Sequence, residues 1–281
     1  MLDETCGGST WRWSIVTSSP TNSQLAGVLA GVLFTGIVLL FGRKGRPNLQ
    51  TIALLSAAFL ALSLDSYLFS LVTGIRPVVL GAGVSTEACM QAWAQGMPAS
   101  GLLAAGGTAL VCGIGWMLSS HLTASTNRSL AGVDDHGYVR KLTCFMVAVV
   151  IVTTTLLLMM TTLDFLEVMY RFHASSLLKW VTGTILVGTA GVSVVIAGWR
   201  TRRMLGAAPT TDPSHGKLPA ATYTIVALSG AGTIFAGVLT RLPIVWAPTS
   251  TNVVVAFALV LGAAGPAAVS VLLAMSLPSQ H

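Results

Sequence analysis

Long apolar runs, separated by short polar segments, dominate the pattern of the chain. Seven of these runs are long enough to cross a bilayer as helices, because one crossing needs about 20 apolar residues. They are Leu25–Gly42, Thr51–Thr73, Pro98–Leu118, Leu142–Leu166, Trp180–Trp199, Ala220–Leu239 and Val253–Leu277. A helix satisfies its backbone hydrogen bonds internally in lipid. The pattern therefore predicts an all-α fold, a polytopic membrane helical bundle with about seven transmembrane helices.

The composition indicates the same environment. Hydrophobic residues make up 53% of the chain and charged residues only 9%, whereas about a quarter of the residues in a soluble domain are charged. Residues 1–23 are polar and lack the basic start of a secretory signal, so we expect an extracytoplasmic N-terminal segment there. Residues 24–278 would then form one seven-helix transmembrane domain. The expected location is integral and multi-pass, in the plasma (cytoplasmic) membrane.

The cations are divided unevenly between the two sides of this bundle. If the N-terminus is outside, ten Lys and Arg residues fall in inner segments and five in outer segments. The positive-inside rule then predicts an N-out/C-in orientation. The net charge of +6 is explained by this topology and requires no nucleic acid as a partner. Membrane lipid is the expected partner.

The cysteines fall into two pairs that differ in depth. Cys6 and Cys89 both lie on the outer side of the predicted topology, where an oxidising exterior permits a disulfide between them. Cys112 and Cys144 lie within the third and fourth runs, where a thiol usually packs as a small apolar group. Neither Cys/His metal spacing nor a mid-membrane histidine pair occurs in the sequence. No metal and no cofactor are therefore expected.

Small residues recur every four positions in three runs. The stripes are Gly101, Ala105, Ala109 and Gly113 in the third run, Gly27 and Gly31 in the first, and Ser229, Thr233 and Gly237 in the sixth. Such stripes let helices approach closely. We expect them to form seams within the bundle, and a protein partner bound to these helix faces is the alternative. In the seventh run, Gly265-Pro266 predicts a bend.

Asp65 is the least expected residue, since it places a carboxyl about two-thirds of the way along the second run. Near the middle of a membrane such a group costs roughly 2.5–3.5 kcal/mol on insertion scales. We therefore expect Asp65 to face the bundle, where it either finds a hydrogen-bond partner or is protonated. A functional role and a structural bond to Thr, Ser or Tyr are the two explanations.

A second group of ionisable residues ends the fourth run, in the sequence TLDFLEVMYRFH. Residues three or four apart share a helix face, as Asp164 and Glu167 do. Because the second and fourth runs cross in the same direction, the sequence predicts an outward-facing site for ligand binding or proton coupling. Its candidate residues are Asp65, Tyr67, Asp164, Glu167, Tyr170, Arg171 and His173. For the fourth-run residues, a solvated helix end is the alternative.

Two classes of function remain open. The first is an accessory or scaffold subunit, or partner-binding component, of a membrane assembly, which the small-residue stripes favour. The second is a small transporter, channel or ligand-binding membrane receptor with an outward-facing acidic site around Asp65. An intramembrane enzyme has the least support, because no acid, base and nucleophile converge and no catalytic residue is predicted. A seven-helix count alone selects no function.

Overall fold

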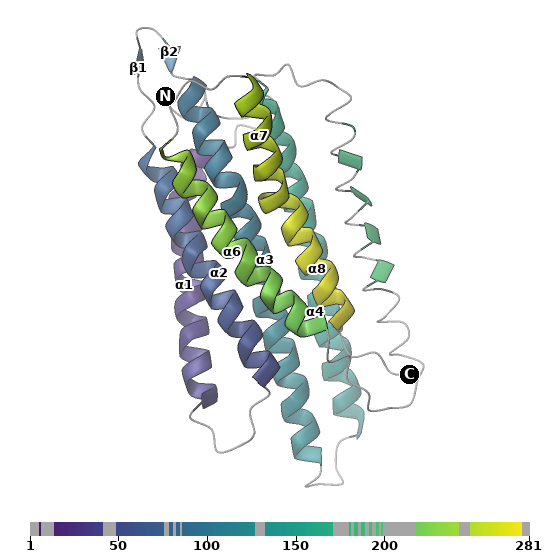
Figure 1. Ribbon diagram of the computed structural model, residues 1–281. Coiled ribbons are helices and arrows are strands. Elements are labelled where there is room, and N and C mark those ends of the chain that lie inside the picture. Colours follow the sequence, from purple (N-terminus) through teal and green to yellow (C-terminus); the bar gives the residue numbers. More distant parts are fainter. Residues whose placement is uncertain are drawn as a thin grey trace.

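The computed structural model describes residues 6, 14–41, 49–75, 79–80, 83–84, 86–126, 133–170, 217–241 and 248–276, with isolated positions between 180 and 198. The helices are α1 (Ile15–Phe41), α2 (Leu49–Gly74), α3 (Thr86–Thr126), α4 (Val133–Met169), α6 (Lys217–Leu239), α7 (Pro248–Leu259) and α8 (Gly265–Ser276) (Figure 1). A π-helical turn, Val260–Ala264, joins α7 to α8. Between α2 and α3, the short strands β1 (Val79–Leu80) and β2 (Gly83–Val84) pair antiparallel.

Six helical segments of the described residues are long and apolar enough to cross a membrane. They are Ile15–Phe41, Leu49–Gly74, Ala88–Met117, Phe145–Met169, Leu218–Leu239 and Thr251–Ser276. The prediction of a helical, multi-pass membrane protein is therefore confirmed. Half of the positions in the predicted run Trp180–Trp199 lie outside the described residues, and the positions that are described within it are helical.

α1 begins at Ile15 rather than at Leu25, so part of the predicted N-terminal segment belongs to a helix. Its first turns are polar, and that polarity suggested an external segment. Several of the serine hydroxyls there are hydrogen-bonded within the bundle. Ser23 donates a hydrogen bond to the carbonyl of Ser66 on α2 at 2.8 Å, and Ser66 donates one back to the carbonyl of Ser23 at 2.9 Å. Helix pairing thus removes the cost of burying these hydroxyls.

α3 runs through the proline that the apolar pattern indicates as a helix start. It begins at Thr86 and contains Pro98. A proline inside a helix removes one hydrogen bond, here to the carbonyl of Ala94, and costs about 3 kcal/mol. Trp93 and Met97, which precede the proline, are wholly buried in the bundle. Burying such side chains contributes about 1.5–3 kcal/mol each, which is enough to carry the helix through the proline.

A disulfide between Cys6 and Cys89 ties the N-terminal segment to the beginning of α3, with the two Cα atoms 5.3 Å apart. This is the pair that the predicted topology selects. The indole nitrogen of Trp93 donates a hydrogen bond to the carbonyl of Cys6 at 2.9 Å, so Cys6 is held on the helix by this bond as well as by the disulfide. Cys112 is buried in α3 as a free thiol, and the side chain of Cys144 lies outside the described residues.

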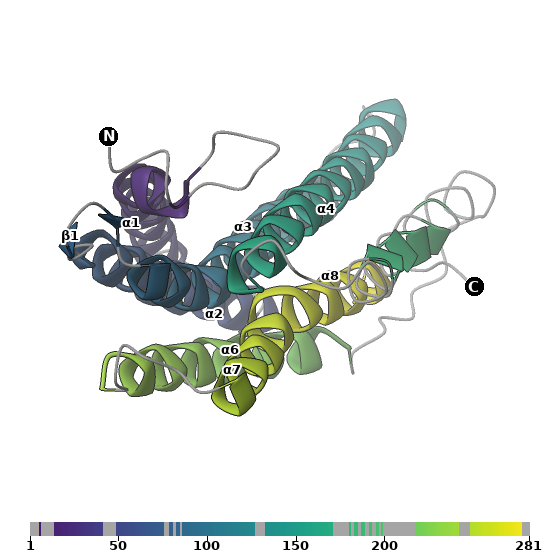
Figure 2. The ribbon, with the colours of Figure 1, turned by 90° about the horizontal axis from the view of Figure 1, so that it is seen from above.

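α3 is the central helix of the described bundle. It contacts α1, α2, α4, α6, α7 and α8, as well as the π-helical turn. Seen from above, α1 and α4 lie on one side of the bundle, and α6 and α7 lie on the other (Figure 2). α2 and α4 pack against different sides of α3. A residue on α2 that faces α3 is therefore separated from α4 by the body of that helix.

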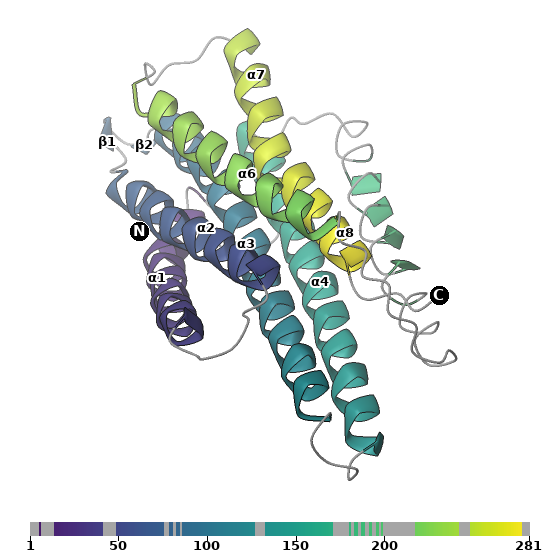
Figure 3. The ribbon, with the colours of Figure 1, turned by 60° about the horizontal axis from the view of Figure 1, so that its bottom comes forward.

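A π-helical turn lies immediately before the proline at the position of the predicted bend, Gly265-Pro266. The N–H of Gly265 donates to the carbonyl of Val260, five residues earlier. Pro266 has no N–H to offer the carbonyl of Gly262. The wider turn carries the chain from α7 into α8, and this pair crosses α6 (Figure 3). A π turn is a known way for a helix to absorb a local break in its bonding.

The small-residue stripe of α3 forms seams inside the bundle. A Cβ added to Gly101 would lie 2.7 Å from Gly262 Cα and 2.8 Å from Gly262 O. A Cβ added to Gly113 would lie 2.5 Å from the side chain of Leu55 on α2. The Gly101 contact requires glycine, since it is with backbone atoms that cannot move aside, whereas at Gly113 the Leu55 side chain would have to shift. The stripe on α3 is buried against other helices of the bundle, so a protein partner could not bind to this face of α3.

We expect Gly101→Ala to lower the stability of the bundle by about 1–3 kcal/mol, because the new methyl overlaps the backbone of the π-helical turn. Gly107→Ala is the matched control on the same helix, since a Cβ there meets nothing within 4 Å. It should leave stability unchanged or raise it by up to about 1 kcal/mol. Thermal unfolding in mild detergent measures both, and equal effects would contradict the seam.

Candidate functional site

Asp65 is wholly buried on the face of α2 that packs against α3. One turn before it, Leu62 lies against Gly106 of α3, where an added Cβ would be 2.9 Å from Leu62 Cγ. One turn after it, Phe69 packs in a cluster that includes Leu102 of α3. Residues three or four apart share a helix face, so Asp65 points into the same interface. The expectation that this carboxyl faces the bundle agrees with its position.

Asp65 has no bond that would explain its burial. Neither carboxyl oxygen has a hydrogen-bond partner within the described part of the chain. The structural explanation drawn from the sequence, a bond to Thr, Ser or Tyr, is therefore not seen there. Leaving a buried polar group unsatisfied costs about 1–3 kcal/mol. Stability does not account for an acid at this position.

The predicted acidic cluster does not assemble. Tyr67 is 54% exposed and lies on a different face of α2 from the wholly buried Asp65. Asp164, on α4, packs on the other side of α3 from α2. The two acids thus belong to separate environments, although both occupy helices that run in the same direction.

The other residues predicted for the site, at the end of the fourth run, lie in different surroundings. Tyr170 donates a hydrogen bond to Asn252 Oδ1 at 3.0 Å, which ties the end of α4 to α7. Glu167 is partly buried and lies one turn from Asp164, close enough for its charge to act on that residue. Arg171 and His173 lie outside the described residues. Of the predicted residues that the structure describes, only Asp164 lines the cavity described next.

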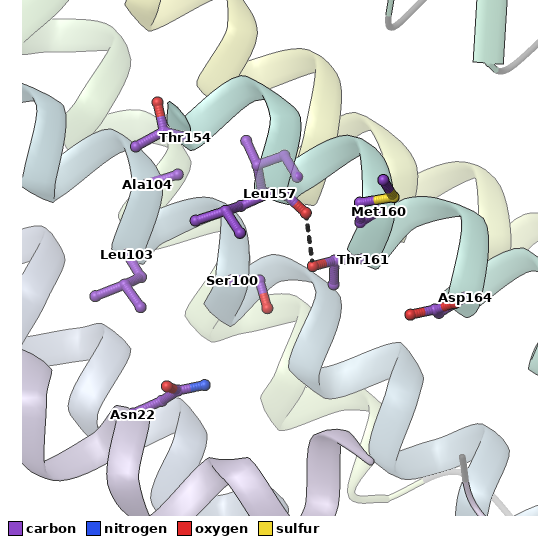
Figure 4. Close-up of a pocket in the computed structure, with 10 residues that line it drawn as sticks. Asn22, Ser100, Leu103, Ala104, Thr154, Leu157, Met160, Thr161 and Asp164 are labelled. Carbon is purple, nitrogen blue, oxygen red and sulfur yellow. Dashed lines mark hydrogen bonds between the residues drawn. The ribbon is translucent and has the colours of Figure 1, made fainter. Parts of the chain in front are cut away.

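A cavity of about 590 Å³ lies between α1, α3 and α4 (Figure 4). α1 contributes one polar side chain, α3 contributes the middle of the wall, and α4 supplies most of the remaining lining. The lining residues are Asn22, Ser100, Leu103, Ala104, Thr154, Leu157, Leu158, Met160, Thr161 and Asp164. The cavity is partly open, and apolar surface makes up most of its wall.

The hydroxyl groups of the cavity wall are bonded to their own helices. Ser100 donates to the carbonyl of Gly96 at 3.0 Å. Thr154 donates to Val150 at 2.8 Å, and Thr161 donates to Leu157 at 2.9 Å, as Figure 4 shows for the second pair. These hydroxyls have already used their protons and contribute little free polarity.

Asn22 and Asp164 differ from the hydroxyl residues. Among the described residues, neither has a hydrogen bond or an ion pair to the protein. Both are only partly buried. The cavity therefore presents one amide and one carboxyl that remain available to a bound molecule. An apolar concave site with a few such polar groups is the usual form of a small-molecule site.

Sequence reasoning missed Asn22 and the α3 wall. Asn22 falls within residues 1–23, which the polar pattern assigns to an external segment. A signal was nevertheless present on α4. Thr154 and Thr161 are seven residues apart, which places them on one helix face, and Asp164 follows three residues later on that face. This polar stripe faces α3 and the cavity rather than lipid.

We expect Asp65→Leu to raise the free energy of unfolding by about 1–3 kcal/mol, because it removes an unsatisfied buried carboxyl. Asp65→Asn keeps a polar group and should change stability less. Ser66→Ala is the neighbouring control, and it should change stability in the opposite direction. It deletes a 2.9 Å hydrogen bond between helices and should lower the free energy of unfolding by about 0.6–1.7 kcal/mol. Thermal unfolding in detergent compares the three. A destabilised Asp65→Leu protein would show that the carboxyl makes favourable interactions.

Comparison with known proteins adds no functional constraint. No protein-family model, no curated protein and no solved structure matches the chain. Within the described residues, no group of three or more His, Cys, Asp or Glu is placed to hold a metal ion. The candidate site is therefore defined by its geometry, a membrane cavity with Asn22 and Asp164 in its wall.

Proposed function

We propose that the protein is a ligand-binding membrane receptor or transporter and that its ligand occupies the cavity between α1, α3 and α4. The cavity itself is the observation that carries this proposal. Its volume of about 590 Å³ lies within the roughly 300–1,000 Å³ of typical small-molecule sites. The acid of this site is Asp164, and Asp65 does not line it.

Access from the membrane follows from the position of the cavity. Its lining comes from α1 and α4, which lie on the same side of the bundle, and from α3 behind them (Figure 2). Both outer helices also expose large apolar side chains, among them Val28 of α1 and Leu157 of α4. A molecule dissolved in the bilayer can therefore reach the cavity laterally without crossing the bundle. Such access suits an apolar or amphiphilic ligand.

The topology of the proposed protein has seven spans and an N-out/C-in orientation. Besides the six helices that are long and apolar enough to span the membrane, the proposal counts the run Trp180–Trp199, which lies between α4 and α6 in the sequence and is the fifth span in chain order. The orientation rests on ten cations in inner segments against five in outer ones. The plasma membrane is the proposed location. In this orientation, the Cys6–Cys89 disulfide lies on the oxidising side.

A second candidate is an accessory subunit that binds a protein partner within the membrane. The outer face of α1 favours it, since Gly31, nine residues from Asn22 and therefore on the opposite side of the helix, has nothing within 4 Å of an added Cβ. Small exposed residues permit the close approach of another helix. Most of α1 is also unburied, because only 17% of its most apolar window is buried. A partner helix would cover this face and leave the cavity on the other side of α1 accessible.

Reporter fusions test the proposed orientation. A reporter placed after His281 and one placed within Arg43–Gln50 should both signal from the cytoplasmic side, because the excess of Lys and Arg in the inner segments, Arg43, Lys44 and Arg46 among them, sets the orientation of the whole bundle. A fusion within the β1–β2 hairpin should signal from the other side. An extracytoplasmic signal at either of the first two positions would contradict the topology.

Native mass spectrometry of the full chain in mild detergent tests ligand binding. We expect a co-purifying small molecule on the wild-type protein and its loss from Ala104→Phe, which fills the cavity wall. Ala53→Phe introduces the same side chain at an exposed position of α2 and should retain the molecule. An empty wild-type protein would contradict the proposal. A stoichiometric protein partner without a small molecule would favour the accessory subunit.

A further inference from the structure

We propose that the ligand of the α1/α3/α4 cavity is an amphiphile with a protonated amine at one end and a single hydrocarbon chain at the other. This assignment rests on the proposed function and names the class of its ligand. Three properties of the cavity carry it: an acid at one end that is unpaired among the described residues, a described lining that contains no base, and a remainder that is mostly apolar.

The head-group end is formed by Asp164. Asp164 forms no ion pair or hydrogen bond within the described part of the chain, so its oxygens can accept from an ammonium group. Asn22, on α1, lies nearer Leu103 than Asp164 (Figure 4) and adds a separate polar contact to the wall. Glu167 adds negative charge one turn along α4. Hydrogen bonds from an amine cation to a carboxylate are about twice as strong as neutral ones.

The lining selects against other head groups. Among the described residues that line the cavity, none is Lys, Arg or His. An anionic head group would face Asp164 without a compensating cation from this lining, and like charges at short range repel. The phosphate of an aminophospholipid would meet the same difficulty. A free amine amphiphile, rather than a phospholipid, is therefore the ligand that this charge arrangement fits.

The remaining wall fits a hydrocarbon chain. Leu103, Leu157 and Leu158 line it, together with hydroxyl residues already bonded to their own helices. Thr154 precedes Asp164 by ten positions on α4, which corresponds to a rise of about 15 Å along the helix. This rise is about half of the roughly 30 Å hydrocarbon core.

The depth of Asp164 in the membrane indicates how a bound amphiphile would be oriented. Asp164 lies five residues before Met169, the end of the candidate span, which corresponds to about 7.5 Å. A bound amphiphile would thus hold its amine near the membrane surface and its chain toward the midplane. Lipids in the surrounding leaflet have this orientation, so the ligand can enter from the bilayer without turning over.

The test compares dodecylamine, dodecanol and dodecanoate on the full-length protein in nonionic detergent at neutral pH. Apparent affinities are measured by native mass spectrometry. We expect the wild-type protein to bind dodecylamine at least about tenfold more tightly than the other two, as one charge-assisted bond provides. Asp164→Asn should reduce that preference to about twofold or less. Asp65→Asn, which removes a carboxyl outside the cavity, should preserve it.

The outcomes separate this inference from the proposed function. If all three probes bind equally and Ala104→Phe abolishes their binding, the amine assignment is overturned while the cavity remains a binding site. If no probe binds in a manner sensitive to Ala104→Phe, both fall. A short-chain phosphatidylethanolamine should bind more weakly than dodecylamine, and equal or tighter binding would overturn the choice of a free amine. A preference unchanged in Asp164→Asn would also overturn it.

Discussion

The close backbone contact between Gly101 of α3 and Gly262 of the π-helical turn constrains the rest of the bundle. Membrane helices gain little from hydrophobic association, so they depend on packing at short range. Here a methyl group at Gly101 would overlap Gly262 Cα at 2.7 Å. The contact holds the interrupted last span against α3, and the wider π turn supplies the backbone that approaches it. α3 thereby becomes the helix that most of the others contact.

A central α3 also determines what the two membrane acids can do. Asp65 lies between α2 and α3, wholly buried and without a partner among the described residues. Asp164 lies on the opposite side, in the wall of an accessible cavity. The two residues have the same chemistry and similar sequence surroundings. Their different access to a ligand arises from which side of α3 their helix occupies, and a single sequence does not contain that information.

The apolar runs of the sequence predicted the helical membrane class, and the depth of the cysteines selected the pair that the structure joins. Both follow from local composition. The start of α1 and the passage of α3 through Pro98 could not be read in the same way. Ser23 is satisfied by Ser66, which is distant in sequence, and the cost of Pro98 is offset by burial of Trp93 in the bundle. These outcomes depend on contacts that form only in the folded protein.

The same reasoning explains why the cavity is less polar than its residue names suggest. A hydroxyl in lipid without a partner is costly, so Ser100, Thr154 and Thr161 donate to carbonyls of their own helices. Their bonding leaves a wall that is close to hydrocarbon in character. Asn22 and Asp164 form no such hydrogen bond among the described residues, so their oxygen atoms remain available to accept a hydrogen bond from a ligand. The acid is thereby confined to one end of the cavity, at Asp164, and an amphiphile with a cationic head group matches that distribution.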